Sequence, residues 1–297
     1  MTGTEIELPV DGGVLSGLDF GGGGRNVLLV HGSGQNAAAW TDVATRLADR
    51  CHPVAVDLRG HGQTRLASTG PEQYWQDIGS VVAALSWERP LLVGHSSGGY
   101  AVTAAAACGL LEPAALCLVD GMVLNDRGTA LAWHAAARTA EAADRLRTRF
   151  RYGWETGEEQ MQAYVGRCVR DAADDPLNAG ARPGLVGAVA RRSFLRRGGR
   201  WVRQPTVEEI AAVSDVGQCA HAFPSNDVYE RVTCPVTVVL ADGGSYAARR
   251  DEVRAVVDAA PGRRLVELAS NHNVPMTKPA ELAAVVLGLL EDGVRQA

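Results

Sequence analysis

Hydrophobic residues along this chain follow two alternating patterns. Short runs that are apolar throughout and bounded by turn residues predict strands buried on both faces of a sheet. Six such runs stand out, at 26–31, 52–57, 90–94, 115–120, 235–240 and 264–268. Between most of them, apolar positions recur at helical spacing. The predicted helices are 38–50, 71–87, 97–111, 250–259 and 278–291.

Strands that alternate with helices in this way predict an α/β fold, with a mostly parallel sheet covered by helices on both faces. Near the N-terminus, two segments with alternating polarity, 5–10 and 14–20, flank the turn sequence Asp11-Gly12-Gly13. Because Asp-Gly is a strong hairpin turn, these segments predict an antiparallel hairpin that precedes the parallel strands.

The alternation stops between Val123 and Asp227, in a stretch rich in alanine and arginine that we predict to be helical. A helical insertion inside a parallel-sheet domain indicates a lid over a site, and a subdomain that only adds bulk is the alternative. We therefore expect one core, formed by residues 1–121 and 228–297, interrupted by a cap of residues 122–227.

Composition and charge narrow the class of protein. The 297 residues carry 34 acids against 29 bases, and a net charge of −5 argues against a dedicated nucleic-acid binder. The first ten residues lack the pattern of a signal peptide, and the apolar stretch 282–290 is about half of what a bilayer needs. Six cysteines without a C-x-x-C pair indicate free thiols in a reducing compartment. We expect a cytoplasmic protein without membrane contact.

A candidate nucleophile lies in Gly94-His95-Ser96-Ser97-Gly98, which fits the pattern G-x-S-x-G. The motif follows a predicted strand and opens an alanine-rich helix, as a nucleophile elbow requires. Glycines beside the serine let the backbone turn tightly so that the hydroxyl stands clear. The helix N-terminus supplies free N–H groups for developing negative charge. The spacing makes Ser96 the nucleophile.

Two further motifs follow earlier predicted strands, His31-Gly-Ser-Gly34 and Asp57-Leu-Arg-Gly-His-Gly62. Together with the serine motif and a late histidine, in this order, they resemble the α/β-hydrolase superfamily, in its serine-nucleophile branch. The resemblance covers about residues 4–121 and 228–297. It implies the α/β-hydrolase fold, with a mostly parallel eight-stranded sheet flanked by helices and an inserted helical cap.

The same resemblance assigns roles near the serine. It implies an oxyanion hole formed by the backbone N–H groups of Ser33 and Ser97. We place His31 and Gly32 at the substrate pocket, although His31 is usually a scaffold residue in the family and its ring need only border the pocket. The turn that begins at Asp57 is a structural feature beside the sheet.

His272 is the expected base among seven histidines. It follows the last predicted strand, in the loop 269–275 that matches the family's catalytic-histidine loop. His95 adjoins the nucleophile, but its side chain should point away from the exposed face of the elbow. His134 and His221 lie in the insertion and are candidates for contact with substrate.

The acid of the triad has two candidates, because the family's usual position for it falls on Gly244. Asp242 stands two residues earlier. Asp120 ends the strand after the nucleophile helix, where some members of the superfamily carry their acid. Neighbouring strand ends lie about 5 Å apart, so Asp120 could reach a histidine placed over Ser96. We expect Asp120, with Asp242 or no acid at all as open alternatives.

These residues predict a serine hydrolase that cleaves a carboxylic ester or thioester of a small to medium, largely apolar molecule through an acyl-enzyme. Two alternatives belong to other classes: a cofactor-free lyase or oxygenase with His272 as general base, and a ligand-binding receptor with little turnover. We expect no metal and no organic cofactor, because the sequence has no H-E-x-x-H, P-loop or dinucleotide fingerprint.

Arginines crowd into the insertion: residues 121–203 hold fifteen arginines against nine acids. Such an excess could receive a carboxylate, a CoA thioester or an acyl carrier protein, but a solvated helix face is the interpretation we favour. Trp133 and Trp154 are candidates for an apolar pocket wall, with ordinary packing as the alternative. We expect a small-molecule substrate and a monomer or homodimer.

Overall fold

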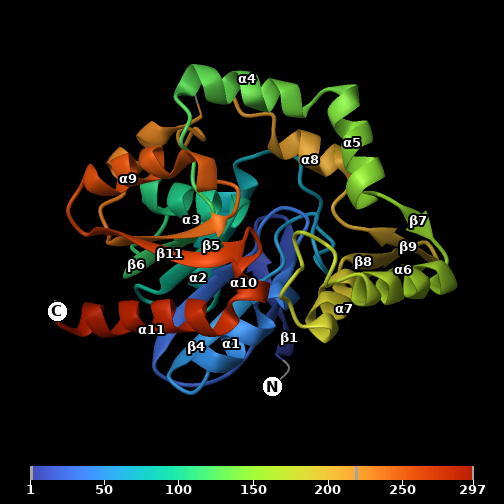
Figure 1. Cartoon of the computed structure of the whole chain (residues 1–297), viewed down its shortest axis with the longest axis horizontal. Coiled ribbons are helices and arrows are strands. Elements are labelled where there is room, and N and C mark those ends of the chain that lie inside the picture. Colours follow the sequence, from blue (N-terminus) through green and yellow to red (C-terminus); the bar gives the residue numbers. More distant parts are fainter. Residues whose placement is uncertain (1–2, 218–219, 296–297) are drawn as a thin grey trace.

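The computed structural model describes residues 3–217 and 220–295, and an eight-stranded sheet runs through its centre (Figure 1). The strand order is β1-β2-β4-β3-β5-β6-β10-β11. The six strands β4, β3, β5, β6, β10 and β11 pair in parallel. The first two strands, β1 and β2, form an antiparallel hairpin, and β2 pairs antiparallel with β4. The mostly parallel α/β fold predicted from the sequence is confirmed. The strands are β1 Thr4–Val10, β2 Gly13–Asp19, β3 Arg25–Val30, β4 Cys51–Val56, β5 Leu91–His95, β6 Ala115–Val119, β10 Val236–Gly243 and β11 Arg263–Asn271.

Helices cover both faces of the sheet, and along the chain most of them connect one strand of the sheet to the next (Figure 1). Because βαβ connections return the chain to the same edge, the carboxyl ends of β3, β5, β6 and β10 lie side by side. The core helices are η1 Ala37–Trp40, α1 Thr41–Leu47, α2 Gln73–Ala84, α3 Ser97–Ala107, η2 Asn226–Arg231, η3 Ala247–Arg249, α9 Arg250–Asp258, α10 Val274–Thr277 and α11 Pro279–Arg295.

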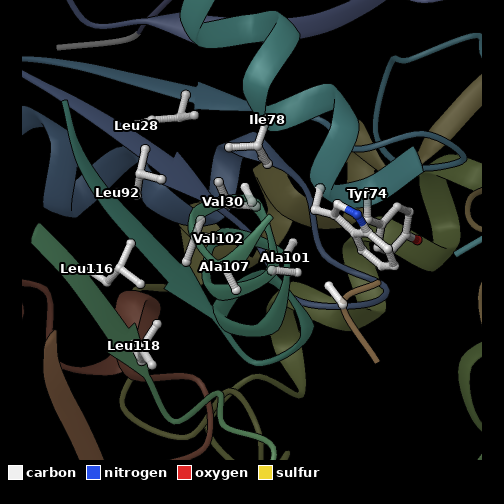
Figure 2. Packing of buried hydrophobic residues seen from close by; sticks show 14 of the residues in the cluster. Leu28, Val30, Tyr74, Ile78, Leu92, Ala101, Val102, Ala107, Leu116 and Leu118 are labelled. Carbon is white, nitrogen blue, oxygen red and sulfur yellow. The ribbon is translucent and has the colours of Figure 1, made fainter. Parts of the chain in front are cut away.

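The strands send successive side chains to opposite faces, so each face of the sheet has its own hydrophobic cluster. On one face, Leu28, Leu92 and Leu116 of three neighbouring strands pack towards Ile78 of α2 and Val102 of α3 (Figure 2). The opposite face, which includes Val27, Leu29 and Val93, packs on α1 and α11. Burial on both faces explains why these strands are apolar throughout.

The insertion lies between β6 and β10 and occupies one end of the molecule (Figure 1). The prediction of an entirely helical segment was wrong in one part, because three strands form a small sheet of order β7-β9-β8. Gly198-Gly199, both at positive φ, turns β8 into β9, and Gly-Gly is a hairpin turn that the surrounding arginines obscured. The elements are α4 Arg127–Ala137, α5 Ala140–Phe150, β7 Glu155–Thr156, α6 Glu158–Arg170, α7 Pro183–Arg192, β8 Phe194–Arg197, β9 Arg200–Arg203 and α8 Val207–Val213.

Arg192, at the end of α7, joins the insertion to the core. Its Nε donates to Asp57 at 2.9 Å, and its terminal nitrogens donate to Glu5 at 2.5 and 2.9 Å. Asp57 is fully buried and also accepts from the backbone N–H groups of Ala37 and Gln63. Burial raises the pKa of the Asp57 carboxyl, and the Arg192 guanidinium opposes that shift. The turn at Asp57 therefore anchors the insertion.

The five cysteines that the structure describes are free, and Cys219 lies outside the described residues. None of the described helices combines the length and the apolar character that a membrane span requires.

Candidate active site

Ser96 lies at the sharp turn from β5 into α3, with φ 51° and ψ −123°. A positive φ is costly for a residue with a side chain, and such strain is typical of functional sites. The Ser96 N–H donates to the carbonyl of Val119 at the end of β6. A Cβ on Gly98 would come within 2.5 Å of the carbonyl oxygens of Val30 and His31, so only glycine allows this approach.

The loop after β3 lies against this turn. A Cβ on Gly32 would come within 2.8 Å of the Cβ of Ser96. Among the described residues, the backbone N–H groups of Ser33 and Ser97 donate no hydrogen bond. Ser97 is the first residue of α3, where N–H groups have no partner within the helix. Two unpaired N–H groups thus flank the candidate nucleophile.

His272 follows β11, and its Nδ1 lies 2.6 Å from Oδ2 of Asp120 at the end of β6. The Asp120 side chain is fully buried and accepts two further hydrogen bonds, from the N–H groups of Ser245 at 2.8 Å and Ala241 at 3.3 Å. The Ser245 hydroxyl also lies 3.0 Å from Nδ1 of His272. Because Nδ1 faces the carboxylate, it carries the proton and leaves Nε2 free to accept one.

The alternative acid is placed elsewhere. Asp242 accepts a hydrogen bond from the Ser270 N–H at 3.0 Å and is exposed. A Cβ on Gly244 would come within 2.4 Å of Oδ2 of Asp120. The Asp120 carboxylate therefore fills the space that a side chain at position 244 would need, which gives a physical reason for glycine there.

His95 supports the loop of His272, a role that the sequence did not reveal. Its Nε2 lies 2.8 Å from the carbonyl oxygen of His272, so Nε2 carries the proton and donates. The two rings lie 4.7 Å apart, and burial lowers the pKa of His95 to about 3. No local signal marks this residue or Ser245, because their partners are distant in sequence.

Ser96 and His272 line the same cavity, of about 590 Å³, together with Gly32. Within the described residues no hydrogen bond joins the two side chains, and such bonds commonly tighten only when substrate binds. A second cavity, of about 1000 Å³ and mostly apolar, is lined by Ser97 and Trp133. The two cavities share Ser33 and residues of α5. Their volumes suit small-molecule ligands.

Two of the expected pocket residues line neither of these two cavities, and their assignment to the substrate pocket stays a prediction. His31 is fully buried: its Nδ1 donates to the carbonyl of Gly32 at 2.8 Å and its Nε2 accepts from the N–H of Leu58 at 3.1 Å. Burial lowers the pKa of His31 to about 4, so the ring is a neutral scaffold. Trp154 packs on Tyr164 and Phe194 within the insertion and lines neither of the two cavities.

The histidines of the insertion differ in position. His134 lines the larger cavity, whereas His221 is exposed and lines neither. Within residues 3–217 and 220–295, no group of three His, Cys, Asp or Glu side chains is placed to hold a metal ion.

The chain is similar in sequence to known proteins. Over 287 residues, the chain is 26% identical to esterase Rv0045c of Mycobacterium tuberculosis, a match that covers 95% of this chain and 88% of that protein. Over 109 residues it is 36% identical to protein phosphatase methylesterase 1 of Mus musculus, but this match covers only 34% of the chain and 28% of the relative.

Solved structures share the fold. E-2-(acetamidomethylene)succinate hydrolase superimposes with a TM-score of 0.75 at 19% identity, over 97% of this chain and 99% of that one. The thioesterase domain from the curacin biosynthetic pathway gives 0.71 at 20% identity, over 97% and 99%. The sequence profile of the alpha/beta hydrolase family matches residues 27–285. The resemblance noted in the sequence is thereby confirmed, and the chain belongs to the α/β hydrolase family.

Proposed function

We propose that this protein is a serine hydrolase that cleaves a carboxylic ester or thioester, with Ser96 as nucleophile, His272 as base and Asp120 as acid. The observation that carries the proposal is the 2.6 Å contact of His272 with Asp120 beside the cavity that Ser96 also lines. The esterase from Mycobacterium tuberculosis, which matches nearly the whole chain, supports ester cleavage.

The reaction begins with proton transfer. A serine hydroxyl is a weak nucleophile near pH 7 until an imidazole takes its proton. Asp120 holds the His272 ring with Nδ1 protonated, so that Nε2 accepts the Ser96 proton as Oγ attacks the ester carbonyl. The imidazolium that forms is stabilised by the buried Asp120 carboxylate.

The tetrahedral intermediate places negative charge on the former carbonyl oxygen. The unpaired N–H groups of Ser33 and Ser97 are donors for this oxygen, and removal of one such donor costs about 10²–10³ in rate in comparable sites. His272 then protonates the leaving alcohol or thiol. Water, deprotonated by the same ring, releases the acyl group from Ser96 and restores the enzyme.

The cavities set the size and character of the substrate. The larger cavity is mostly apolar and adjoins the elbow at Ser97, so a small to medium apolar portion of the substrate fits there. Residues of α5 in the insertion line both cavities. We propose that the insertion acts as a cap that excludes water from the reacting ester.

The test is covalent labelling. A fluorophosphonate should form one adduct, on Ser96, located by mass spectrometry of peptides, and Ser96→Ala should remove both the adduct and turnover of p-nitrophenyl butyrate. Ser97→Ala is the matched control and should keep the adduct at Ser96. A folded wild-type protein that remains unlabelled, or a Ser96→Ala variant that retains turnover, would overturn the proposal; the second result would favour base chemistry by His272.

A further inference from the structure

Arg203 ends β9, and its side chain lines the cavity that contains Ser96 and His272. Its Nε donates to the carbonyl of Phe150 at 2.7 Å. The Nη1 atom is buried without a hydrogen-bond partner, and neither terminal nitrogen has a partner among the described residues. The guanidinium thus presents its two terminal nitrogens without an acid to receive them.

The acids near this cavity do not neutralise Arg203. Asp175 lines the cavity, but its carboxylate accepts from the N–H of Leu177 at 2.9 Å and from the side chain of Asn178 at 2.8 Å, within its own loop. Arg149 adds a second positive charge to the cavity wall. Arg203 is half-buried, and a charge that loses water without gaining a counter-ion is costly, so an anionic ligand would offset that cost.

Tyrosines place this guanidinium beside the catalytic loops. The Arg203 guanidinium lies 5.1 Å from the ring centre of Tyr164 and 5.9 Å from that of Tyr152. The Tyr152 hydroxyl in turn contacts Gly34, since a Cβ there would lie 1.7 Å from it. One aromatic ring therefore separates Arg203 from the loop that carries Ser33. Burial raises the pKa of Tyr152 to about 12, so this tyrosine supplies no negative charge near neutral pH.

We propose that Arg203 binds a carboxylate of the substrate, so that the ester or thioester cleaved at Ser96 carries a carboxylate at one end and an apolar group at the other. The planar fork of a guanidinium matches a carboxylate with two parallel hydrogen bonds. The apolar group occupies the larger cavity, which the smaller one joins at Ser33. This inference rests on the proposed function, because it names the substrate class of the same site.

The experiment compares a carboxylate with a neutral amide of the same shape, and adds a phosphate ester as a second anion. Benzoate, benzamide and phenyl phosphate are tested as inhibitors of p-nitrophenyl butyrate turnover by wild type, Arg203→Met and Arg200→Met. Arg200 is the matched control, because it lies on the same strand and is exposed. Wild type should bind benzoate about 10- to 100-fold more tightly than benzamide, as expected for charge-assisted hydrogen bonds in a buried site.

In Arg203→Met this ratio should fall severalfold, to what the charge of the exposed Arg149 alone sustains, and in Arg200→Met it should be unchanged. Equal inhibition by benzoate and benzamide in wild type, or a ratio that is unchanged in Arg203→Met, would overturn the inference. Phenyl phosphate that binds more tightly than benzoate would also overturn it, in favour of a phosphate group. If Arg203→Met does not fold, Arg203→Lys replaces it, because it keeps the charge without the planar fork; a ratio below that of wild type supports the inference and an unchanged ratio overturns it.

Failure of the proposed function gives a different result. If wild type does not turn over p-nitrophenyl butyrate, the same ligands are compared by the shift they cause in the thermal unfolding midpoint. A larger shift with benzoate than with benzamide, reduced in Arg203→Met, would support the carboxylate site while the ester-cleaving proposal fails. Equal shifts would overturn the carboxylate site as well.

Discussion

The sheet edge and the insertion both line the cavity that contains Ser96 and His272, and Asp120 of the first differs from Arg203 of the second in how its side chain is partnered. At the sheet edge, Asp120 accepts three hydrogen bonds and both ring nitrogens of His31 contact backbone atoms. In the insertion, buried nitrogen atoms of Arg203 and His134, which line the cavities, have no partner among the described residues.

Two arginines of the insertion show the same difference. The Arg192 side chain is 9% exposed, and acids from two parts of the core, Asp57 and Glu5, neutralise it. Arg203 lines the cavity without an acid. A side chain whose partners come from the protein fixes geometry, whereas one without partners is available to a ligand. Under the proposed function, the sheet edge would set the chemistry and the insertion would select the molecule.

The largest effect should come from the sheet edge. Asp120→Asn would present an amide to His272 Nδ1 and favour the wrong tautomer, so kcat should fall about 10³–10⁴-fold with little change in KM. Turnover of p-nitrophenyl butyrate measures it. Asp242→Asn is the matched control and should stay within threefold of wild type, since Asp242 bonds only the Ser270 N–H in the described structure. Comparable losses in the two variants would contradict the assignment of Asp120.

Much of this edge is predictable from sequence, because its signals are local. Apolar runs fix the strands, and Gly94 and Gly98 mark the elbow, since a Cβ at either would meet backbone at 2.5 Å or less. Strand order does not separate Asp120 from Asp242, because β6 adjoins β5 while β10 adjoins β11; the structure alone shows that His272 contacts Asp120. The roles of His95 and Ser245 cannot be predicted from sequence, because both residues contact His272, which lies far away in the chain.

The insertion is less predictable, for a physical reason. Its helices α4 and α5 each have one buried residue, so few of their positions are constrained by packing against the core. Trp133 and Trp154 look alike in sequence, yet one is 62% exposed at a cavity and the other packs on aromatic rings. The arginine excess of the insertion likewise contains Arg192, which binds the core, and Arg203, which lines a cavity, and the sequence does not distinguish them from the exposed arginines.

A smaller effect should come from the joint between the two regions. Arg192→Met leaves the buried Asp57 carboxylate without its counter-ion, which should lower the free energy of unfolding by about 3–5 kcal/mol. Chemical denaturation at pH 8 measures it. Without Arg192, only the N–H groups of Ala37 and Gln63 oppose the rise that burial causes in the pKa of Asp57, so protonation relieves the cost and the loss should shrink as the pH falls towards 5.

Arg191→Met is the control for this joint, because Arg191 is exposed and bonds only to the Gln162 side chain among described residues. Its effect should stay within about 0.5 kcal/mol. A loss for Arg192→Met no larger than that of Arg191→Met would show that the insertion is held to the core by its apolar contacts, and the contrast between Arg192 and Arg203 would lose its basis.

The smallest effect should come from the wall of the apolar cavity. Trp133 is largely exposed, so a bound acyl chain covers only part of the ring. At about 25 cal/mol per Å² of apolar surface, a contact of roughly 40 Å² contributes about 1 kcal/mol, or about fivefold in binding. Trp133→Ala should therefore raise KM for p-nitrophenyl octanoate about fivefold, raise KM for p-nitrophenyl butyrate less and leave kcat within twofold.

Leu110→Ala is the control, because Leu110 is an exposed hydrophobic residue that lines neither cavity; it should change none of these values. A fall in kcat for Trp133→Ala on both esters would mean that the insertion positions the reacting groups. The assignment of chemistry to the sheet edge and of substrate selection to the insertion would then be wrong.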